Sequence, residues 1–145
     1  MSTRTQYRQV FEAMLNGDAS TAKRLNKAQG EVTWQDSGLL VTAAFALLAE
    51  KRFAADESRT AVKAFVAEAQ QNYADSPTPI KPLVAEAVTR GVLGEESLLE
   101  EVSREDQQST QMLLAYKIVQ DAEMSATDVA RVLDDAEALV DQWTS

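Results

Sequence analysis

One segment of the chain is apolar on every side of the helix that it would form. The run LLVTAAFALLA, residues 39–49, contains a single polar residue, Thr42. A helix without a polar face must be surrounded by lipid or by other protein elements, and this run is far shorter than the roughly 20 residues of a membrane span. Its alanines and the charged residues after it favour helix over strand. The pattern therefore predicts a central core helix that extends to Arg52.

Most of the remaining chain carries apolar residues three and four positions apart, which is the spacing of amphipathic helices. No stretch is typical of a strand. The expected apolar stripes are Tyr7, Val10, Phe11, Met14 and Leu15; Ala22, Leu25 and Ala28; Val62, Phe65, Val66, Ala69 and Tyr73; Leu83, Val84, Ala87 and Val88; Leu98, Leu99 and Val102; Met112, Leu113, Tyr116 and Val119; and Val129, Val132, Leu133, Ala136, Leu139, Val140 and Trp143.

Polar and glycine-containing breaks separate these stripes and predict where the helices begin and end. Three prolines precede a helix that is expected to begin near Pro79 or Pro82 and to end at Gly91. Residues 95–123 form either one long helix or two helices with a break near Ser103, and the cap spacing of Ser103 and Asp106 favours two. The other expected caps are Asp18, Asp56 or Ser58, Ser125 with Asp128, and the box at residues 33–36 that follows a helix stop at Gly30.

The fold class expected from these elements is all-α: a compact bundle or irregular stack of about six to eight helices in one domain, residues 1–145. The helices are also consistent with helical hairpins. The segment WQDSG, residues 34–38, resembles the tetratricopeptide repeat in its tryptophan-to-glycine spacing, but the leucine, tyrosine and alanine positions of that repeat do not match. An irregular bundle and a stack of helical hairpins both stay open.

Composition removes several classes of function. The chain has no cysteine and no histidine, which excludes disulfides, thiol nucleophiles, Cys/His zinc sites and imidazole catalysis. The first ten residues contain no apolar core of signal-peptide length, so we expect a cytoplasmic protein without membrane association. Trp34 and Trp143 lie near helix ends; a buried edge is the favoured role of each, and a partly exposed anchor for a partner is the alternative.

The charge of the chain is strongly uneven. The net charge is −9, and residues 95–145 alone carry −10. A solvated surface accounts for part of this excess, since acidic helix faces are common. The sharper hypothesis is an acidic face that docks a partner, because only Arg131 stands near the acids of the last helix to neutralise them. The expected partner contacts are Glu100, Glu101, Asp134, Glu137 and Asp141.

The leading functional hypothesis is a non-enzymatic helical protein–protein interaction or regulatory module. Its expected partner is another protein with a basic surface. An acidic decoy that imitates nucleic acid is one alternative. Direct nucleic-acid binding is not expected, because the clusters of basic residues are small and the net negative charge of the chain repels phosphate. Head-to-tail self-association between the mildly basic front, with Arg4 and Arg8 on one helix face, and the acidic back is a further alternative; the oligomeric state is open.

Catalysis has one remaining route in this sequence. The chain has no glycine-rich phosphate loop and no G-x-S-x-G motif, so neither a cofactor nor a metal is expected. Carboxylates alone can hold magnesium. The runs EEVSRE, residues 100–105, and DDAE, residues 134–137, resemble the paired carboxylates of all-α nucleotide pyrophosphohydrolases of the MazG type, although Glu105 comes one residue too late. A magnesium-dependent nucleotide hydrolase is therefore an alternative, and a small-ligand sensor would require a pocket between helices.

Overall fold

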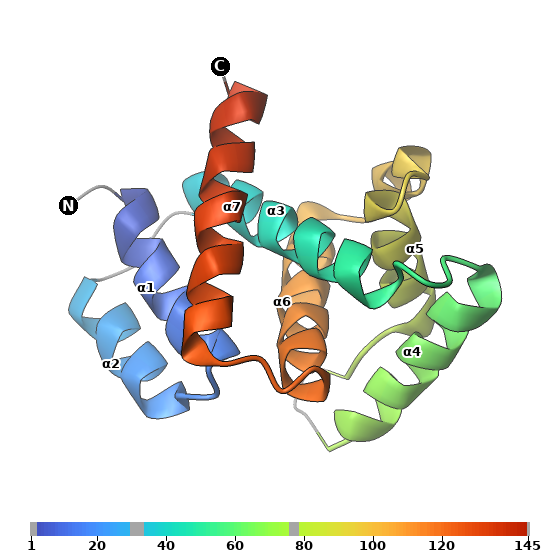
Figure 1. Cartoon of the computed structure of the whole chain (residues 1–145), viewed down its shortest axis with the longest axis horizontal. Helices are drawn as coiled ribbons and strands as arrows, with labels where there is room; N and C mark the ends of the chain where they lie inside the picture. Colours follow the sequence, from blue (N-terminus) through green and yellow to red (C-terminus); the bar gives the residue numbers. More distant parts are fainter. Residues whose placement is uncertain (1–2, 30–33, 76–78, 145) are drawn as a thin grey trace.

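The computed structural model describes residues 3–29, 34–75 and 79–144, and every secondary-structure element in these ranges is a helix (Figure 1). The predicted all-α fold is therefore confirmed. The elements are α1 (Thr3–Leu15), α2 (Ala19–Gln29), α3 (Trp34–Arg52), α4 (Arg59–Asn72), α5 (Pro82–Val92), the short 3₁₀-helix η1 (Glu96–Glu101), α6 (Arg104–Asp121) and α7 (Ala126–Thr144).

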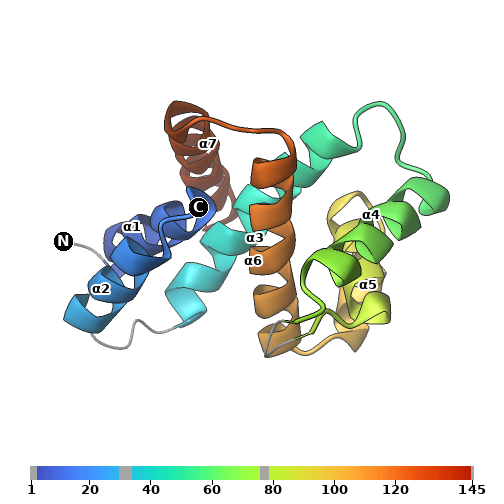
Figure 2. The same cartoon turned by 90° about the horizontal axis from the view of Figure 1, so that it is seen from below.

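The helix α3 runs through the middle of the molecule. It packs against α1, α5, α6 and α7, while α1 pairs with α2 and α4 pairs with α5. Figures 1 and 2 place the α1–α2 pair at one end of α3 and the α4–α5 pair at the other. The two pairs do not stack on each other as they would in a row of hairpins. The fold is an irregular bundle arranged around α3.

Burial confirms the prediction that residues 39–49 form a core helix. Phe45 and Leu48 have no exposed surface, and Leu39 is the large apolar residue of this run that stays exposed, at 40%. Complete burial of one leucine or phenylalanine side chain contributes about 1.5–3 kcal/mol, so α3 supplies much of the apolar driving force for folding. The fully buried residues of α3 are Leu40, Val41, Ala43, Ala44, Phe45, Leu48 and Ala49.

The predicted cap residues that the structure describes form cap hydrogen bonds, and α5 begins at Pro82 as expected without a side-chain cap. Ser58 Oγ accepts from the Ala61 N–H at 3.2 Å, and Ser103 Oγ accepts from the Asp106 N–H at 3.2 Å, so residues 95–123 form two elements. The helix stop expected at Gly30 and the side chains of the box expected at residues 33–36 lie outside the described part of the chain. Asp18 caps α2 by accepting from the Thr21 N–H, and Ser125 and Asp128 cap α7 reciprocally.

The expected inward face of α5 is wrong at one position. Leu83 is 80% exposed, whereas Ala85, Val88 and Thr89 are fully buried. Thr89 occupies a core position because its hydroxyl donates to the Ala85 carbonyl at 2.8 Å, which satisfies the polar group within the helix. The apolar pattern treats Thr89 as polar and so rotates the predicted stripe toward Leu83. The helix ends at Val92, one residue beyond the expected Gly91.

The expected stripe of α6 is too narrow. Val119 is buried as predicted, but Met112, Leu113 and Tyr116 are only partly buried. Because α6 packs against both α3 and α5, it is covered over more than one face. The fully buried residues of α6 include two polar side chains that the apolar pattern cannot predict, Gln111 and Lys117.

The end of α7 differs from its expected placement. Trp143 was expected to have a buried edge, but it is 47% exposed. It continues the apolar stripe of α7, and Figure 1 shows the last turns of this helix extending beyond the neighbouring helices. The apolar stripe of α7 therefore extends past the part of the helix that the neighbouring helices cover. The side chain of Trp34 is not among those described. None of the described helices has the length and hydropathy needed to cross a bilayer.

The same substitution at two leucines tests the assigned burial. We expect Leu48→Ala to lower the free energy of unfolding by about 3 kcal/mol, because it opens a cavity in the core. Leu83→Ala should change it by less than about 0.5 kcal/mol, because that side chain is exposed. Urea denaturation followed by circular dichroism measures both values. Equal losses at the two sites would contradict the orientation of α5.

Candidate functional site

The structure divides the predicted partner contacts into two groups. Asp134, Glu137 and Asp141 lie on α7, whereas Glu100 and Glu101 lie on η1. Both views of the molecule place α6 between these two elements (Figures 1 and 2). The acidic residues expected to form one face thus belong to two separate surfaces, and each surface has its own electrostatic surroundings.

The acids of α7 are paired with the first helix. The Arg8 guanidinium donates to Glu137, to Asp134 Oδ1 at 2.7 Å and to the Ala130 carbonyl at 3.2 Å. Arg4 contacts Asp141 Oδ1 at 2.9 Å and Glu137 Oε1 at 3.8 Å. We call these contacts the α1–α7 seam, defined by Arg4, Arg8, Asp134, Glu137 and Asp141.

The seam corrects the expectation that Arg131 alone stands near these acids. The neutralising cations come from α1, 129 positions away in the case of Arg8 and Glu137. Partial burial lowers the pKa of Arg8, but the hydrogen bonds to Asp134 and Glu137 outweigh it and hold that pKa above its ordinary value. The basic front and the acidic back of the chain therefore meet within one molecule. Their proximity does not require a second copy.

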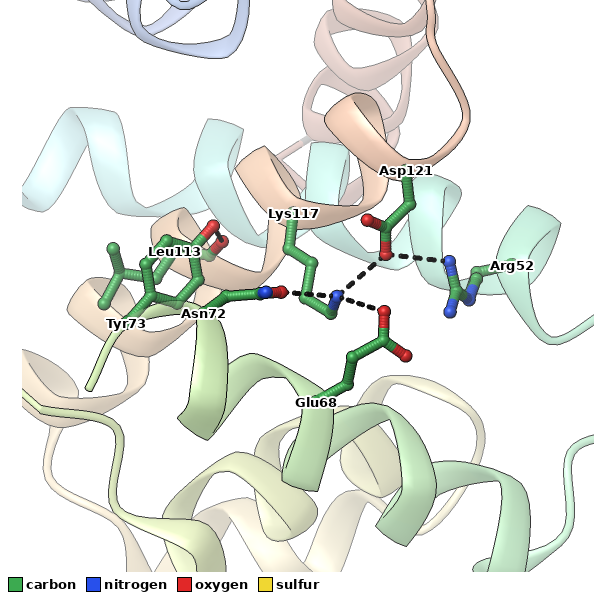
Figure 3. A network of polar contacts seen from close by, with 7 residues as sticks. All are labelled: Arg52, Glu68, Asn72, Tyr73, Leu113, Lys117 and Asp121. Carbon is green, nitrogen blue, oxygen red and sulfur yellow. Dashed lines mark hydrogen bonds and ion pairs between the residues drawn. The ribbon is translucent and has the colours of Figure 1, made fainter.

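A second cluster surrounds a buried lysine (Figure 3). The side chain of Lys117 is 1% exposed, and its Nζ contacts Glu68 Oε1, Asn72 Oδ1 and Asp121 Oδ2, each at 2.9 Å. Arg52 donates to the same Asp121 oxygen at 3.1 Å. An ammonium group has three N–H donors, and these three acceptors can take all of them. The cluster therefore ties α3, α4 and α6 together and leaves Lys117 no donor for a substrate.

The aromatic residues beside this cluster strengthen the same junction. The Phe65 ring centre lies 5.1 Å from the Arg52 guanidinium carbon and 5.7 Å from Lys117 Nζ, within the range of cation–π attraction. The Tyr73 hydroxyl donates to the Leu113 carbonyl at 3.4 Å. Burial, with smaller contributions from Tyr116 and Asp121, raises the pKa of Tyr73 to about 12. The pKa of Tyr73 in the folded chain exceeds the ordinary value of about 10. Its titration therefore lowers the stability of the fold only when pH rises above about 10.

A groove separates the N-terminal halves of α3 and α6. Its volume of about 750 Å³ falls within the size range of small-molecule sites. A Cβ atom on Gly38 would lie 2.0 Å from Gln108 Nε2, so the glycine allows the α6 side chain to pack directly on the α3 backbone. The lining residues are Gly38, Leu39, Thr42, Arg104, Glu105, Gln107, Gln108 and Ser109.

The buried side chain of Gln111, which bonds to the groove residue Thr42, has one polar atom without a hydrogen-bond partner among the described residues. Gln111 is completely buried, and its Oε1 accepts a hydrogen bond from Thr42 Oγ1 at 2.9 Å. Its Nε2 has no hydrogen-bond partner among the described residues. A buried amide N–H that forms no hydrogen bond costs about 1–3 kcal/mol, so this group is a local weakness in the fold. Such exceptions are few in proteins and call for a physical reason.

Comparisons of the chain with protein-family models, with curated proteins and with solved structures found no match.

The carboxylates needed for the magnesium alternative do not converge in the described part of the chain. No group of three or more acidic side chains there is placed to hold a metal ion. The run at residues 100–105 spans the end of η1 and the start of α6, whereas the run at residues 134–137 lies on α7.

Two residues of this site region were missed from sequence. Lys117 and Gln111 are both buried polar residues of α6, and their partners come from other helices. The spacing of Lys117 and Asp121 on one helix face was a visible signal for the first. Nothing in the sequence pairs Gln111 with Thr42, 69 positions earlier.

The lysine cluster predicts that loss of its buried cation destabilises the fold less than loss of its acids does. Lys117→Met keeps the apolar stem and removes the buried cation, while Glu68 and Asp121 can still reach solvent. We expect it to change the free energy of unfolding by less than about 1 kcal/mol. Replacing both acids, in Glu68→Gln/Asp121→Asn, leaves the buried cation uncompensated and should cost about 3 kcal/mol.

Urea denaturation of both variants measures this difference. The double variant Glu57→Gln/Glu123→Gln is the control, since it neutralises two exposed acids elsewhere. If Lys117→Met were the more damaging change, the cluster would not be held together as described.

The α1–α7 seam predicts an energetic coupling between residues at opposite ends of the chain. In a double-mutant cycle of Arg8→Met and Glu137→Gln, we expect a coupling of about 1 kcal/mol, because the two side chains form a charge-assisted hydrogen bond. Added salt should weaken it, since the seam is partly exposed. Arg8→Met combined with Glu123→Gln should give no coupling. A zero value for the first pair would contradict the seam.

Proposed function

We propose that the protein is a non-enzymatic helical interaction module that docks a basic surface of another protein. The contact surface in this proposal is an acidic ridge, defined by Glu96, Glu100, Glu101 and Glu105. All four residues are exposed, and they lie along η1 and the first turn of α6. The observation that carries the proposal is the contrast between these acids and those of the seam.

The acids of the ridge have no partner among the described cations, whereas their neighbours do. Arg90 forms two hydrogen bonds with Glu95, at 2.6 and 2.8 Å, and Lys81 lies 3.6 Å from Asp106. Those pairs neutralise the flanks of the ridge and leave its own charges in solvent. Free exposed carboxylates can exchange water for the cations of a partner and increase the rate of encounter.

The ridge is also held in one conformation. Leu99 packs against Gly91, where a Cβ atom would lie 2.6 Å from Leu99 Cγ. Gln107 Nε2 donates to the Leu99 carbonyl at 2.8 Å and to the Val102 carbonyl at 2.9 Å, which fixes the end of η1 against α6. A surface that is ordered before binding loses less conformational entropy when a partner docks.

The α1–α7 seam occupies three of the five expected partner contacts. Glu100 and Glu101 remain proposed partner contacts. Asp134, Glu137 and Asp141 already bind Arg4 and Arg8, so a partner would have to compete with cations of the same chain. This pairing also shortens the row of free charge that an acidic decoy would need, and we therefore favour docking of a basic protein surface.

Charge reversal on the ridge tests the proposal. The variant Glu96→Lys/Glu100→Lys/Glu101→Lys should lose the proteins that the immobilised wild-type chain captures from an extract of its source cells. The control, Glu50→Lys/Glu57→Lys/Glu123→Lys, has the same net charge of −3 in place of −9 but an intact ridge, and should retain them. Quantitative mass spectrometry measures capture, and thermal melts confirm that each variant is folded.

Two results would contradict the proposal. One is equal capture by the two variants, which would mean that the ridge does not make the contact. The other is a wild-type chain that captures no protein above the level of an inert acidic control. Reversal of Asp134, Glu137 and Asp141 is not a usable test, because it would also break the seam.

A further inference from the structure

A second cavity lies where the C-terminal ends of α3 and α6 meet the first turns of α7, away from the acidic ridge. Its volume of about 390 Å³ falls within the size range of small-molecule sites. Part of its lining is apolar and comes from the end of α6 and the turn that follows, with Ile118, Ala122 and Met124. Ala122 is exposed and Met124 is half-buried, so both retain surface that an apolar group can contact.

The charged residues of this cavity have the opposite balance to the chain. Three lining residues are basic, and one is acidic. Lys51 and Arg52 belong to the last turn of α3, Arg131 belongs to the second turn of α7, and the acid is Asp128. In a chain of net charge −9, this cavity is a local site of positive charge. Such a concave site attracts an anion at short range.

Two of the three cations have no partner within the chain. Lys51 and Arg131 are exposed, and neither side chain forms an ion pair or a hydrogen bond in the part of the chain that the structure describes. Arg52, in contrast, donates to Asp121 at 3.1 Å (Figure 3). The carboxylate of Asp128 accepts a backbone N–H at the cap of α7 at 3.3 Å. The donors of Lys51 and Arg131 are therefore available to a ligand.

These groups together specify the ligand. A guanidinium can bind a carboxylate through two parallel hydrogen bonds, and an ammonium adds a further donor. The nearby Asp128 and the net charge of −9 both disfavour a doubly charged anion such as a phosphate monoester. We propose that this cavity binds a small monocarboxylate that carries a short apolar chain. Lys51 and Arg131 contact its carboxylate, and Ala122 and Met124 contact its chain.

Hexanoate is a suitable probe, because it joins one carboxylate to an unbranched alkyl chain. Titrated into the ¹⁵N-labelled full chain at constant ionic strength, it should move the backbone amide resonances of Ala122, Met124 and Arg131 along saturable curves. For a ligand of this size we expect a dissociation constant in the millimolar range. Hexanamide, which lacks the charge, and acetate, which lacks the chain, should each bind about tenfold more weakly.

A pair of charge variants tests the two cations. Lys51→Gln/Arg131→Gln should weaken hexanoate binding about tenfold, reported by Ala122 and Met124, because it removes both proposed carboxylate contacts. The control, Lys23→Gln/Arg24→Gln, removes one lysine and one arginine from the exposed surface of α2 and should leave the affinity unchanged. Both variants change the net charge equally, and thermal melts confirm that each is folded.

Several results would overturn the proposal. Shifts that grow linearly with hexanoate, or no shifts at all, would mean that the cavity binds no monocarboxylate. Equal affinity for hexanamide would remove the role of charge, and equal affinity for acetate would remove the role of the apolar chain. Equal effects of the two charge variants would assign the attraction to the whole chain and not to Lys51 and Arg131.

Discussion

α3 has no polar face, and the positions of the other helices follow from the need to cover it. α1, α5, α6 and α7 each pack against it, and the remaining helices attach to these. Its alanines allow the neighbouring helices to approach closely, while Phe45 and Leu48 fill the volume between them. The arrangement is irregular because four helices pack against α3 from different directions. Hairpins stacked in parallel could not cover α3 in this way.

Local signals in the sequence predicted the fold well, and long-range pairings were beyond them. Ser58 and Ser103 cap helices because their hydroxyls bond to an N–H three residues later, a relation that is visible in the sequence. The prediction that Leu83 faces the core was wrong because the apolar pattern counts Thr89 as a polar residue. Thr89 is buried instead, since its hydroxyl donates to a carbonyl of its own helix. Lys117 and Gln111 were missed because a buried polar residue is acceptable only through partners that the fold supplies.

The charges of the chain were predicted in amount but not in distribution. Composition alone indicates an acidic C-terminal third, and it cannot show which acids already have partners. Arg4 and Arg8 neutralise the acids of α7, whereas the acids of η1 have no cationic partner in the part of the chain that the structure describes. Net charge per segment is therefore a poor guide to the surface that a partner meets, since the intramolecular pairing decides which charges remain available.

The α1–α7 seam has a consequence for the order in which the chain acquires its structure. Arg8 and Glu137 are separated by 129 positions, so their contact closes a loop that includes most of the protein. During synthesis α1 cannot gain these partners until α7 has left the ribosome, and contacts of such high order form late in folding. The seam therefore requires both α1 and α7, and we expect it to close after the intervening helices have brought the two together.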